Sequence, residues 1–515
     1  MLLLSLVMGA LALVAHAQNA TFPDDFLFAV SSAAYEIEGG WDADGKGVSI
    51  WDTLTHDSSQ YINDGSNGDV ASDSYHKYEE DVQLVRALGV DIYRFSISWA
   101  RVLPVGDVSQ INQAGVDYYN NLIDLLIANG IQPMVTMYHY DLPQPLQLLG
   151  GWTNPVVAQY FREYARFLFQ AFGDRVKWWV TFNEPTTIAF GYSSTDTNAP
   201  AIGAHGFGDY TAAHCILRAH AMAYRLYDQQ FRAAQGGYVS IALNSNFYVP
   251  ATNSTEDSEA AERALQFFLG WFAHPIYTEE GGYPLVMQGR IWEDCINDNI
   301  WISRLPEFSA QELVDLRGNV NRKNGMVFID LRCVDLYGAA DFFALNHFTT
   351  QLASNGQQAD FHPSHDWDTG AILSFDDSWA ATADDKIKVV PWGLRSLLNW
   401  INNEYDVRGG IFVTGNGFPD AGELEDSGRQ EYYRAYLTEI LNAIHEDGIN
   451  VIGYTGWSLL DGFEWIRGYT VKYGFYQVDF SDQNRTRTPK PSATMFQEIV
   501  ATRQLPNRAA KPTFT

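Results

Sequence analysis

Cysteine is scarce in this sequence. Only Cys215, Cys295 and Cys333 occur among 515 residues, and they permit one disulfide with one thiol left over, whose pairing the sequence does not decide. None of the three lies in a Cys-x-x-Cys pair or in a histidine-rich stretch, so we expect no structural metal site. No motif implies a cofactor either, and none is expected.

Basic residues are also few. The chain has 33 Lys and Arg against 62 Asp and Glu, which gives a formal net charge of −29 at pH 7. The Coulomb interaction with nucleic acid or with an anionic membrane therefore has the wrong sign over the whole surface. We expect neither as a partner, and the acidic surface is typical of a protein that must stay soluble. The oligomeric state is left open.

Long apolar runs are missing after the first few residues. The run over residues 1–14 is too short to span a membrane, and Ala15-His16-Ala17 has the small-x-small pattern that signal peptidases need. We expect residues 1–17 to be a signal peptide and the mature chain, residues 18–515, to be secreted. A secreted chain could then carry N-linked glycans at three sequons, at Asn19, Asn253 and Asn484.

Short β-branched or aromatic runs alternate with longer amphipathic segments along the whole chain. Residues 116–126, ended by Gly130, and residues 160–168, ended by Gly173, have the apolar spacing of helices. Such alternation implies parallel strands joined by right-handed crossovers. Eight strands, the number that a closed barrel needs, are predicted at residues 26–31, 92–97, 134–138, 178–182, 239–243, 342–345, 411–414 and 452–458.

The fold predicted from this pattern is one α/β domain over residues 18–515, a (β/α)8 TIM barrel. No linker or repeat divides the chain, and the long connections 246–299 and 355–385 lie within the alternation, so we interpret them as loop insertions. Side chains that follow the strands of such a barrel converge at one mouth. Those predicted there are Glu36, Arg94, His139, Asn183, Glu184, Asn346, Gly415, Trp457, Glu464 and Trp465.

This set of side chains suits a sugar. Carboxylates, amides and an imidazole accept or donate hydrogen bonds to hydroxyl groups, and indoles pack on the apolar face of a pyranose. The sequence motifs that contain these residues resemble those of glycoside hydrolase family 1, especially its animal and insect-like members. The resemblance covers residues 26–492. The motifs are SAAYEIEG at 32–39, GVSIWD at 47–52, YRFSISW at 93–99, YHYDLPQ at 138–144, TFNEP at 181–185, LNHFT at 345–349 and WSLLDGFEW at 457–465.

The resemblance implies a retaining β-glycosidase with two catalytic glutamates, whose carboxyl groups must lie about 5–5.5 Å apart. The Asn-Glu-Pro word identifies Glu184 as the acid/base. At the position where the family has its nucleophile this chain has Gly415, which cannot attack a sugar. The tyrosine that normally lies beside the nucleophile is Phe348, which has no hydroxyl group. The arginine that normally pairs with the nucleophile is Arg94, and we expect an anion, or Glu36 turned inward, to compensate its buried charge.

The glycon-binding residues that the resemblance implies are Glu36, His139, Asn183, Asn346, Trp457, Glu464 and Trp465. Glu36 replaces the family's glutamine, so ligand preference is expected to differ. Carboxyls on the loop after the seventh strand, Asp420, Glu423 and Glu425, are not expected to replace the nucleophile.

Three functions stay open at this point. The chain is a β-glycosidase with weak or altered activity that uses water or an exogenous anion, a non-catalytic binder or carrier of a β-glycoside or similar small ligand, or a structural protein that keeps only the barrel.

Overall fold

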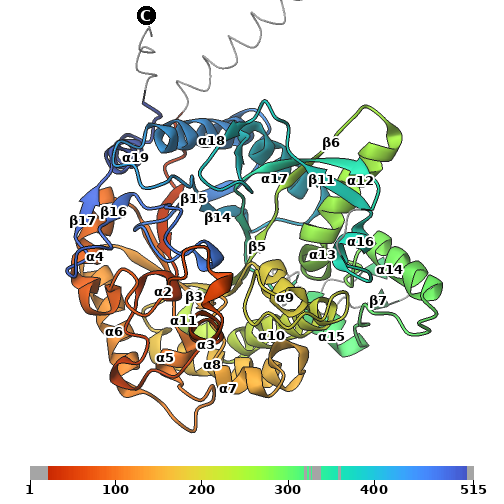
Figure 1. Cartoon of the computed structure of the whole chain (residues 1–515), viewed down its shortest axis with the longest axis horizontal. Coiled ribbons are helices and arrows are strands. Elements are labelled where there is room, and N and C mark those ends of the chain that lie inside the picture. The colour runs from red at the N-terminus through yellow and green to blue at the C-terminus, as the bar shows by residue number, and fades with distance from the viewer. Residues whose placement is uncertain (1–20, 318–321, 324–325, 328–337, 358–360, 507–515) are drawn as a thin grey trace, which may run out of the picture.

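The structure, a computed structural model of the chain, describes residues 21–317, 322–323, 326–327, 338–357 and 361–506. At its centre lies a closed barrel of parallel strands (Figure 1), joined in sequence order from β1 round to β15, which pairs again with β1. The barrel strands are β1 (Leu27–Ser32), β2 (Ile92–Ser96), β3 (Gln132–Tyr138), β4 (Trp178–Asn183), β5 (Tyr238–Asn244), β9 (Phe343–Asn346), β14 (Ile411–Asn416) and β15 (Val451–Trp457). The predicted (β/α)8 barrel is confirmed, and every predicted strand lies within two residues of its observed ends.

The barrel interior is filled by side chains. Register places Ala29 of β1 opposite Ile92 of β2, and Ala344 of β9 lies opposite both Ala242 of β5 and Phe412 of β14. These residues pack in one buried cluster. The layer closes the barrel below the carboxyl ends of the strands, as in other packed TIM barrels, and leaves the mouth for a site.

Helices surround the barrel. Both helices predicted from apolar spacing are confirmed, and Phe161, Tyr164, Leu168 and Phe172 of α8 are fully buried at the expected intervals. The longer helices are α4 (Ser74–Leu88), α6 (Gln113–Ala128), α8 (Val156–Phe172), α10 (Gly208–Gln230), α17 (Pro391–Glu404), α18 (Ser427–His445) and α19 (Pro491–Thr502). No helix in the described residues is long and apolar enough to cross a membrane.

The two long connections form structure beside the barrel. The strands β6 (Phe247–Pro250), β10 (Thr350–Asn355) and β11 (Ala371–Ser374) make a small sheet, against which α12 (Thr255–Leu265) packs. The helices α13 (Trp271–Tyr277), α14 (Leu285–Asn297), α15 (Ala310–Arg317) and α16 (His365–Thr369) lie nearby (Figure 1).

The remaining elements are short and lie in the loops. They are α2 (Ala34–Ile37), α3 (Ile50–Asp57), α5 (Trp99–Val102), α7 (Gln144–Leu148), α9 (Pro185–Ser193), α11 (Arg232–Gln235), β7 (Arg322–Lys323), β8 (Met326–Val327), β12 (Ala380–Ala381), β13 (Lys388–Val389), β16 (Tyr476–Val478) and β17 (Arg487–Pro489).

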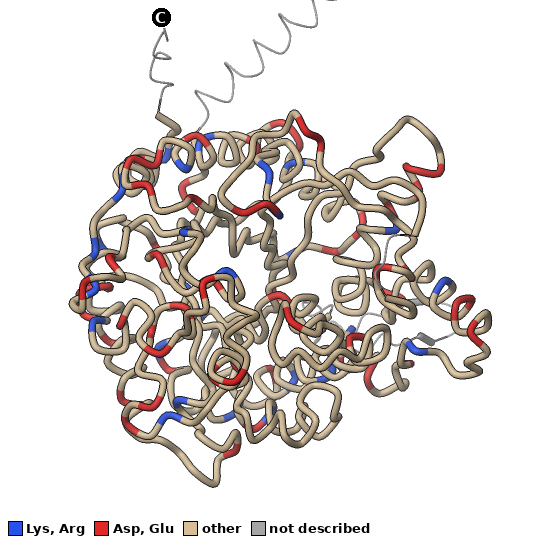
Figure 2. The backbone as a smooth tube through the Cα atoms, viewed as in Figure 1, with Lys and Arg blue, Asp and Glu red and all other residues tan. Residues whose placement is uncertain are grey.

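Features predicted for the secreted chain fall on both described and undescribed residues. Cys215 and Cys295 are buried free thiols, so they are not bonded to each other. Cys333, Asn19 and residues 1–17 lie outside the described residues. Asn253 and Asn484 are exposed, as a glycan requires. Figure 2 shows Asp and Glu distributed over the whole described chain, so the negative charge is not confined to one face.

Candidate active site

A cavity of about 330 Å³ lies at the carboxyl ends of the barrel strands. Of the side chains predicted to gather there, it is lined by Glu36, His139, Asn183, Glu184, Asn346, Phe348, Trp457, Glu464 and Trp465. The other two, Arg94 and Gly415, lie beneath this lining and contact it through Asn183 and Asn346. Residues from strands far apart in the sequence therefore lie in one pocket, as expected for side chains at the carboxyl ends of TIM-barrel strands.

Glu184 is held firmly at the end of β4. Its backbone has a φ of 49°, a left-handed conformation that costs a non-glycine residue about 1–3 kcal/mol and that clusters at functional sites. One carboxylate oxygen accepts hydrogen bonds from the Tyr140 hydroxyl at 2.7 Å and the Thr187 hydroxyl at 3.1 Å. The other accepts from the Asn346 amide at 2.8 Å. Three donors fix the orientation of this carboxyl group in the pocket.

Gly415, near the end of β14, lies against the side chain of Asn346. A Cβ atom built on Gly415 would be 2.9 Å from both Cγ and Oδ1 of Asn346. That amide is fixed by the Thr414 hydroxyl, which donates to Oδ1 at 2.9 Å, and by donation from its Nδ2 to Asn183 Oδ1 at 3.0 Å. Gly415 is not in the left-handed backbone region, so its backbone does not require glycine.

Arg94 lies buried beneath the pocket with neutral partners. Its guanidinium donates to the Thr414 carbonyl at 2.7 Å, to Asn183 Oδ1 at 2.6 Å and to the Thr136 hydroxyl at 3.2 Å. Within the described ranges no carboxylate forms an ion pair with it, Glu36 included. Burial lowers the pKa of Arg94 to about 10, although the charge of Glu184 opposes that shift. The anion expected beside Arg94 stays a prediction.

His139 and Asn183 form the next part of the lining. The Asn183 amide donates to His139 Nε2 and to the Tyr140 hydroxyl, each at 3.0 Å. Burial, with a smaller contribution from Arg94, holds the pKa of His139 well below its usual range. Because the amide nitrogen can only donate, this contact suits a ring whose Nε2 accepts and whose Nδ1 carries the proton.

Glu36 and Glu464 are two buried carboxyls on one wall of the cavity. Glu36 is 1% exposed and Glu464 is 7% exposed, and in the part of the chain that the structure describes Oε1 of each has no hydrogen-bond partner. Burial, followed by the charge of Glu464, raises the pKa of Glu36 well above its usual range. Burial also raises the pKa of Glu464 to about 8; Lys472 opposes that shift, whereas Asp461 and Asp384 add to it.

We expect these raised pKa values to make the stability of the fold depend on pH. The folded state binds more protons than the unfolded chain, so the contribution of Glu464 is fully present below its ordinary pKa of 4.5 and is lost as the pH rises through about 8. Between about pH 5 and pH 8, the unfolding free energy of wild type should fall by about 1–3 kcal/mol more than that of Glu464→Gln. Urea unfolding at several pH values measures this difference.

The control for this measurement is Glu259→Gln, because Glu259 is exposed on α12. Its unfolding free energy should run parallel to that of wild type at every pH. A Glu464→Gln curve that is also parallel to wild type would show that Glu464 titrates normally in the folded protein.

The sequence did not identify several lining residues. They are Tyr140, Thr187, Asn198, Asn244, Asn246, Asp384, Lys386, Arg467 and Tyr473. Most of them lie in long loops. The convergence of strand ends at one mouth of the barrel does not predict where the residues of such loops lie. Two signals were available. Asn244 ends the barrel strand β5, where side chains converge on the mouth, and Thr187 lies one helical turn from Glu184 at the start of α9.

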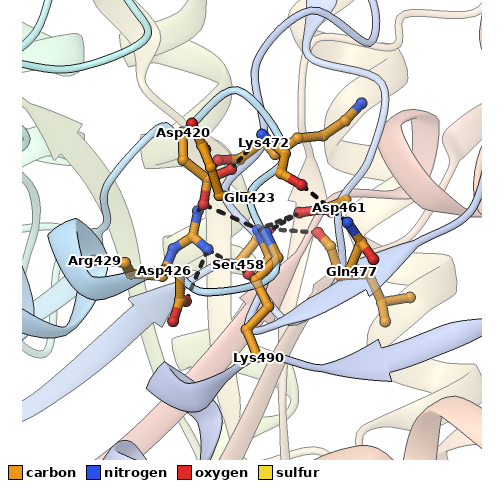
Figure 3. Close-up of polar contacts among 12 residues, drawn as sticks. Asp420, Glu423, Asp426, Arg429, Ser458, Asp461, Lys472, Gln477 and Lys490 are labelled. Carbon is orange, nitrogen blue, oxygen red and sulfur yellow. Dashed lines mark hydrogen bonds and ion pairs between the residues drawn. The ribbon is translucent and has the colours of Figure 1, made fainter.

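A buried ion-pair network supports the segment that carries Glu464. Arg429 of α18 pairs with Asp420 and with Asp426 at 3.3 Å, and Lys490 pairs with Asp461 at 3.0 Å and with Asp420 at 3.5 Å (Figure 3). Asp461 lies between Trp457 and Glu464 in the chain, so the network anchors the loop that lines the pocket. Asp420 is thereby committed to ion pairs, and neither Glu423 nor Glu425 lines the cavity.

One group in the described residues has the spacing of metal ligands. Asp294, Asp298 and His362 bring three ligand atoms within 4.8 Å of one another. Asp294 already pairs with Arg304 at 2.8 Å, and none of the three lines the active-site cavity. This cluster has no part in the site.

Comparison with known proteins agrees with this geometry. The family model "Glycosyl hydrolase family 1" matches residues 18–505. Myrosinase 1 of Brevicoryne brassicae is 46% identical over 483 residues, which cover 93% of this chain and 98% of that protein. Aphid myrosinase superposes with a TM-score of 0.86 at 45% identity over 94% of this chain and 99% of that one. A rice β-glucosidase mutant in a covalent complex with Glc superposes with a TM-score of 0.82 at 38% identity over 92% and 98% of the two chains. The chain belongs to glycosyl hydrolase family 1.

Proposed function

We propose that this chain binds β-glycosides of the glucoside or galactoside type in the cavity and hydrolyses them weakly or not at all. The observation that supports this most strongly is the neighbourhood of Gly415, where the Asn346 amide lies 2.9 Å from the place of a Cβ atom. Retaining hydrolysis needs a second carboxyl about 5–5.5 Å from the acid/base. Residue 415 provides only a hydrogen atom there.

The remaining machinery favours binding over turnover. Glu184 is still oriented by three donors, and it can protonate a leaving oxygen only if another group attacks the anomeric carbon. Phe348 brings no hydroxyl to the cavity, and Arg94 is satisfied by neutral oxygens. The second candidate, slow hydrolysis with an exogenous anion or water as nucleophile, is favoured by the retained position of Glu184.

Truncating Trp457 should weaken glycoside binding. Trp457 is 8% exposed and lines the cavity, and a buried aromatic contact at a binding site contributes about 1–3 kcal/mol, so Trp457→Ala should raise the dissociation constant for methyl β-glucoside or methyl β-galactoside about 10- to 100-fold. Titration calorimetry gives the affinity. Trp301→Ala is the matched control, because Trp301 is 73% exposed and away from the cavity. Equal affinities of the two variants, or no glycoside binding by wild type, would contradict the proposal.

We further propose that the protein is secreted as residues 18–515 after loss of residues 1–17 and that it carries N-linked glycans. The exposed sequons at Asn253 and Asn484 support this, together with Asn19 near the new amino terminus. N-terminal sequencing of protein secreted by cultured eukaryotic cells should begin at Gln18, and enzymatic removal of N-glycans should lower its mass. Retention of the whole chain inside the cells would contradict secretion.

A further inference from the structure

The two carboxyls on one wall of the cavity are buried without an ion-pair partner among the described residues, although the charge of Lys472 is near enough to lower the pKa of Glu464. Within the same residues, Oε1 of Glu36 and Oε1 of Glu464 lack hydrogen-bond partners, although both side chains line the cavity. No lysine, arginine or histidine of the described residues forms an ion pair with either. An unpaired buried carboxylate is costly, so these oxygens are positioned for a group that a ligand brings.

The basic side chains near these carboxyls form other hydrogen bonds or ion pairs, or lie at the edge of the cavity. Lys472 donates to the Tyr469 carbonyl at 2.6 Å, and Arg467 pairs with Asp384 at 2.6 Å and with Asp385. Lys386 lines the cavity but is exposed at its edge. Glu184 adds a third carboxyl to the same cavity. The inner pocket therefore has free carboxyl oxygens, and no basic side chain of the described residues is paired with them.

A protonated amine matches this wall better than a hydroxyl does. An ammonium group has three donors and a positive charge, so it can donate to both free oxygens and neutralise the pair. The aromatic faces of Trp457, Trp465 and Tyr473 also line the cavity, and such faces attract cations. A neutral sugar hydroxyl has a single donor and leaves the two carboxyls in mutual repulsion unless one of them is protonated.

We propose that the cavity prefers a basic, amine-bearing glycoside to a neutral one and that Glu36 and Glu464 are the acceptors that select it. This specificity rests on the proposed function, since it requires that the cavity hold a sugar. An ammonium group in the cavity favours the ionised form of both carboxyls, and Glu36→Gln keeps the size of the side chain while it removes one of the two ionisable groups.

The test uses the mature protein and five probes, methyl β-glucoside and its analogues with one hydroxyl replaced by an amine at C2, C3, C4 or C6. At a pH where the amine is charged, at least one analogue should bind wild type about tenfold more tightly than the parent glucoside, as for a charge-assisted hydrogen bond. In Glu36→Gln the affinities for the analogue and the parent should differ by less than twofold, and circular dichroism matching that of wild type shows that the variant is folded. Glu259→Gln should keep the preference of wild type.

The outcomes separate this inference from the proposed function. If wild type binds the parent and no amine analogue more tightly, the cavity holds neutral sugars and the inference is wrong, whereas the proposed function stands. If Glu36→Gln keeps the amine preference, Glu36 does not select the ligand. If neither parent nor analogues bind, the proposed function fails and this inference with it.

Discussion

Replacing Gly415 by glutamate should convert the protein into an active retaining β-glycosidase. The variant Gly415→Glu restores a carboxyl opposite Glu184, and loss of an attacking nucleophile typically costs several orders of magnitude, so kcat/KM for an aryl β-glucoside or β-galactoside should rise about 10³-fold. The backbone of Gly415 permits the change because its φ is not left-handed. The obstacle is Asn346, whose amide lies 2.9 Å from the new Cβ atom and must shift.

Two further variants make this result interpretable. Gly415→Gln has nearly the same shape as glutamate but cannot form a glycosyl ester, so it should stay inactive. The double variant Gly415→Glu/Phe348→Tyr returns a hydroxyl to the neighbourhood of the carboxylate and should be at least as active as the single one. Equal activity of wild type and Gly415→Glu would mean that residue 415 does not provide the nucleophile.

Azide offers a separate check on unaltered protein. It can attack the anomeric carbon from the space beside Gly415 while the bond to the aglycone oxygen breaks and Glu184 donates its proton to that oxygen. A single displacement inverts the anomeric carbon, whereas the two displacements of a retaining enzyme restore its configuration. The glycosyl azide should therefore have the inverted configuration.

Removing Arg429 should destabilise the fold strongly. This guanidinium is fully buried, pairs with Asp420 and Asp426, and donates to the carbonyls of Gly474 and Lys472 (Figure 3). Arg429→Ala leaves Asp426 without its ion-pair partner and leaves Asp420 with only Lys490, at 3.5 Å. The unfolding free energy should therefore fall by about 3–5 kcal/mol. Urea unfolding followed by tryptophan fluorescence measures it.

The matched control for Arg429 lies on the same helix. Arg434 pairs with Glu431 at 3.0 Å near the surface, and Arg434→Ala should cost about 1 kcal/mol or less. If Arg429→Ala unfolds at the same urea concentration as this control, the network does not stabilise the protein as its burial implies.

The barrel could be predicted from the sequence because its signals are local. Each strand is a short apolar run, and residues such as Ala29, Ile92 and Phe412 are fully buried because helices cover the outside while side chains fill the inside. Glu184 and Trp457 were predictable for the same reason, since they follow strands directly and lie within recognisable words.

Other parts of the site depend on distant contacts that no local pattern encodes. The place of the Asn346 amide against Gly415 results from hydrogen bonds to Thr414, Asn183 and Glu184, which come from other strands. Loop residues such as Lys386 also line the cavity. The loops that carry them have no helical or strand periodicity in the sequence from which their position could be predicted. The sequence analysis expects an anion or Glu36 beside Arg94, whereas three neutral oxygens accept its hydrogen bonds in the structure.

We propose that two positions decide what this barrel does with a sugar. In this proposal residue 415 controls whether a covalent bond to the sugar forms, and Glu36 controls which charge the cavity favours. Gly415 lies on β14 and Glu36 lies on α2, so each is open to substitution without the other.

Intact-protein mass spectrometry tests the absence of a nucleophile most directly. The protein is incubated with a 2-deoxy-2-fluoro aryl β-glucoside, whose glycosyl-enzyme is slow to hydrolyse, beside the Gly415→Glu variant. Wild type should keep its mass, whereas Gly415→Glu should gain one fluoroglycosyl unit on residue 415. A glycosyl adduct on a carboxyl group of the unaltered protein would contradict the proposal that this member of the family binds glycosides without a catalytic nucleophile.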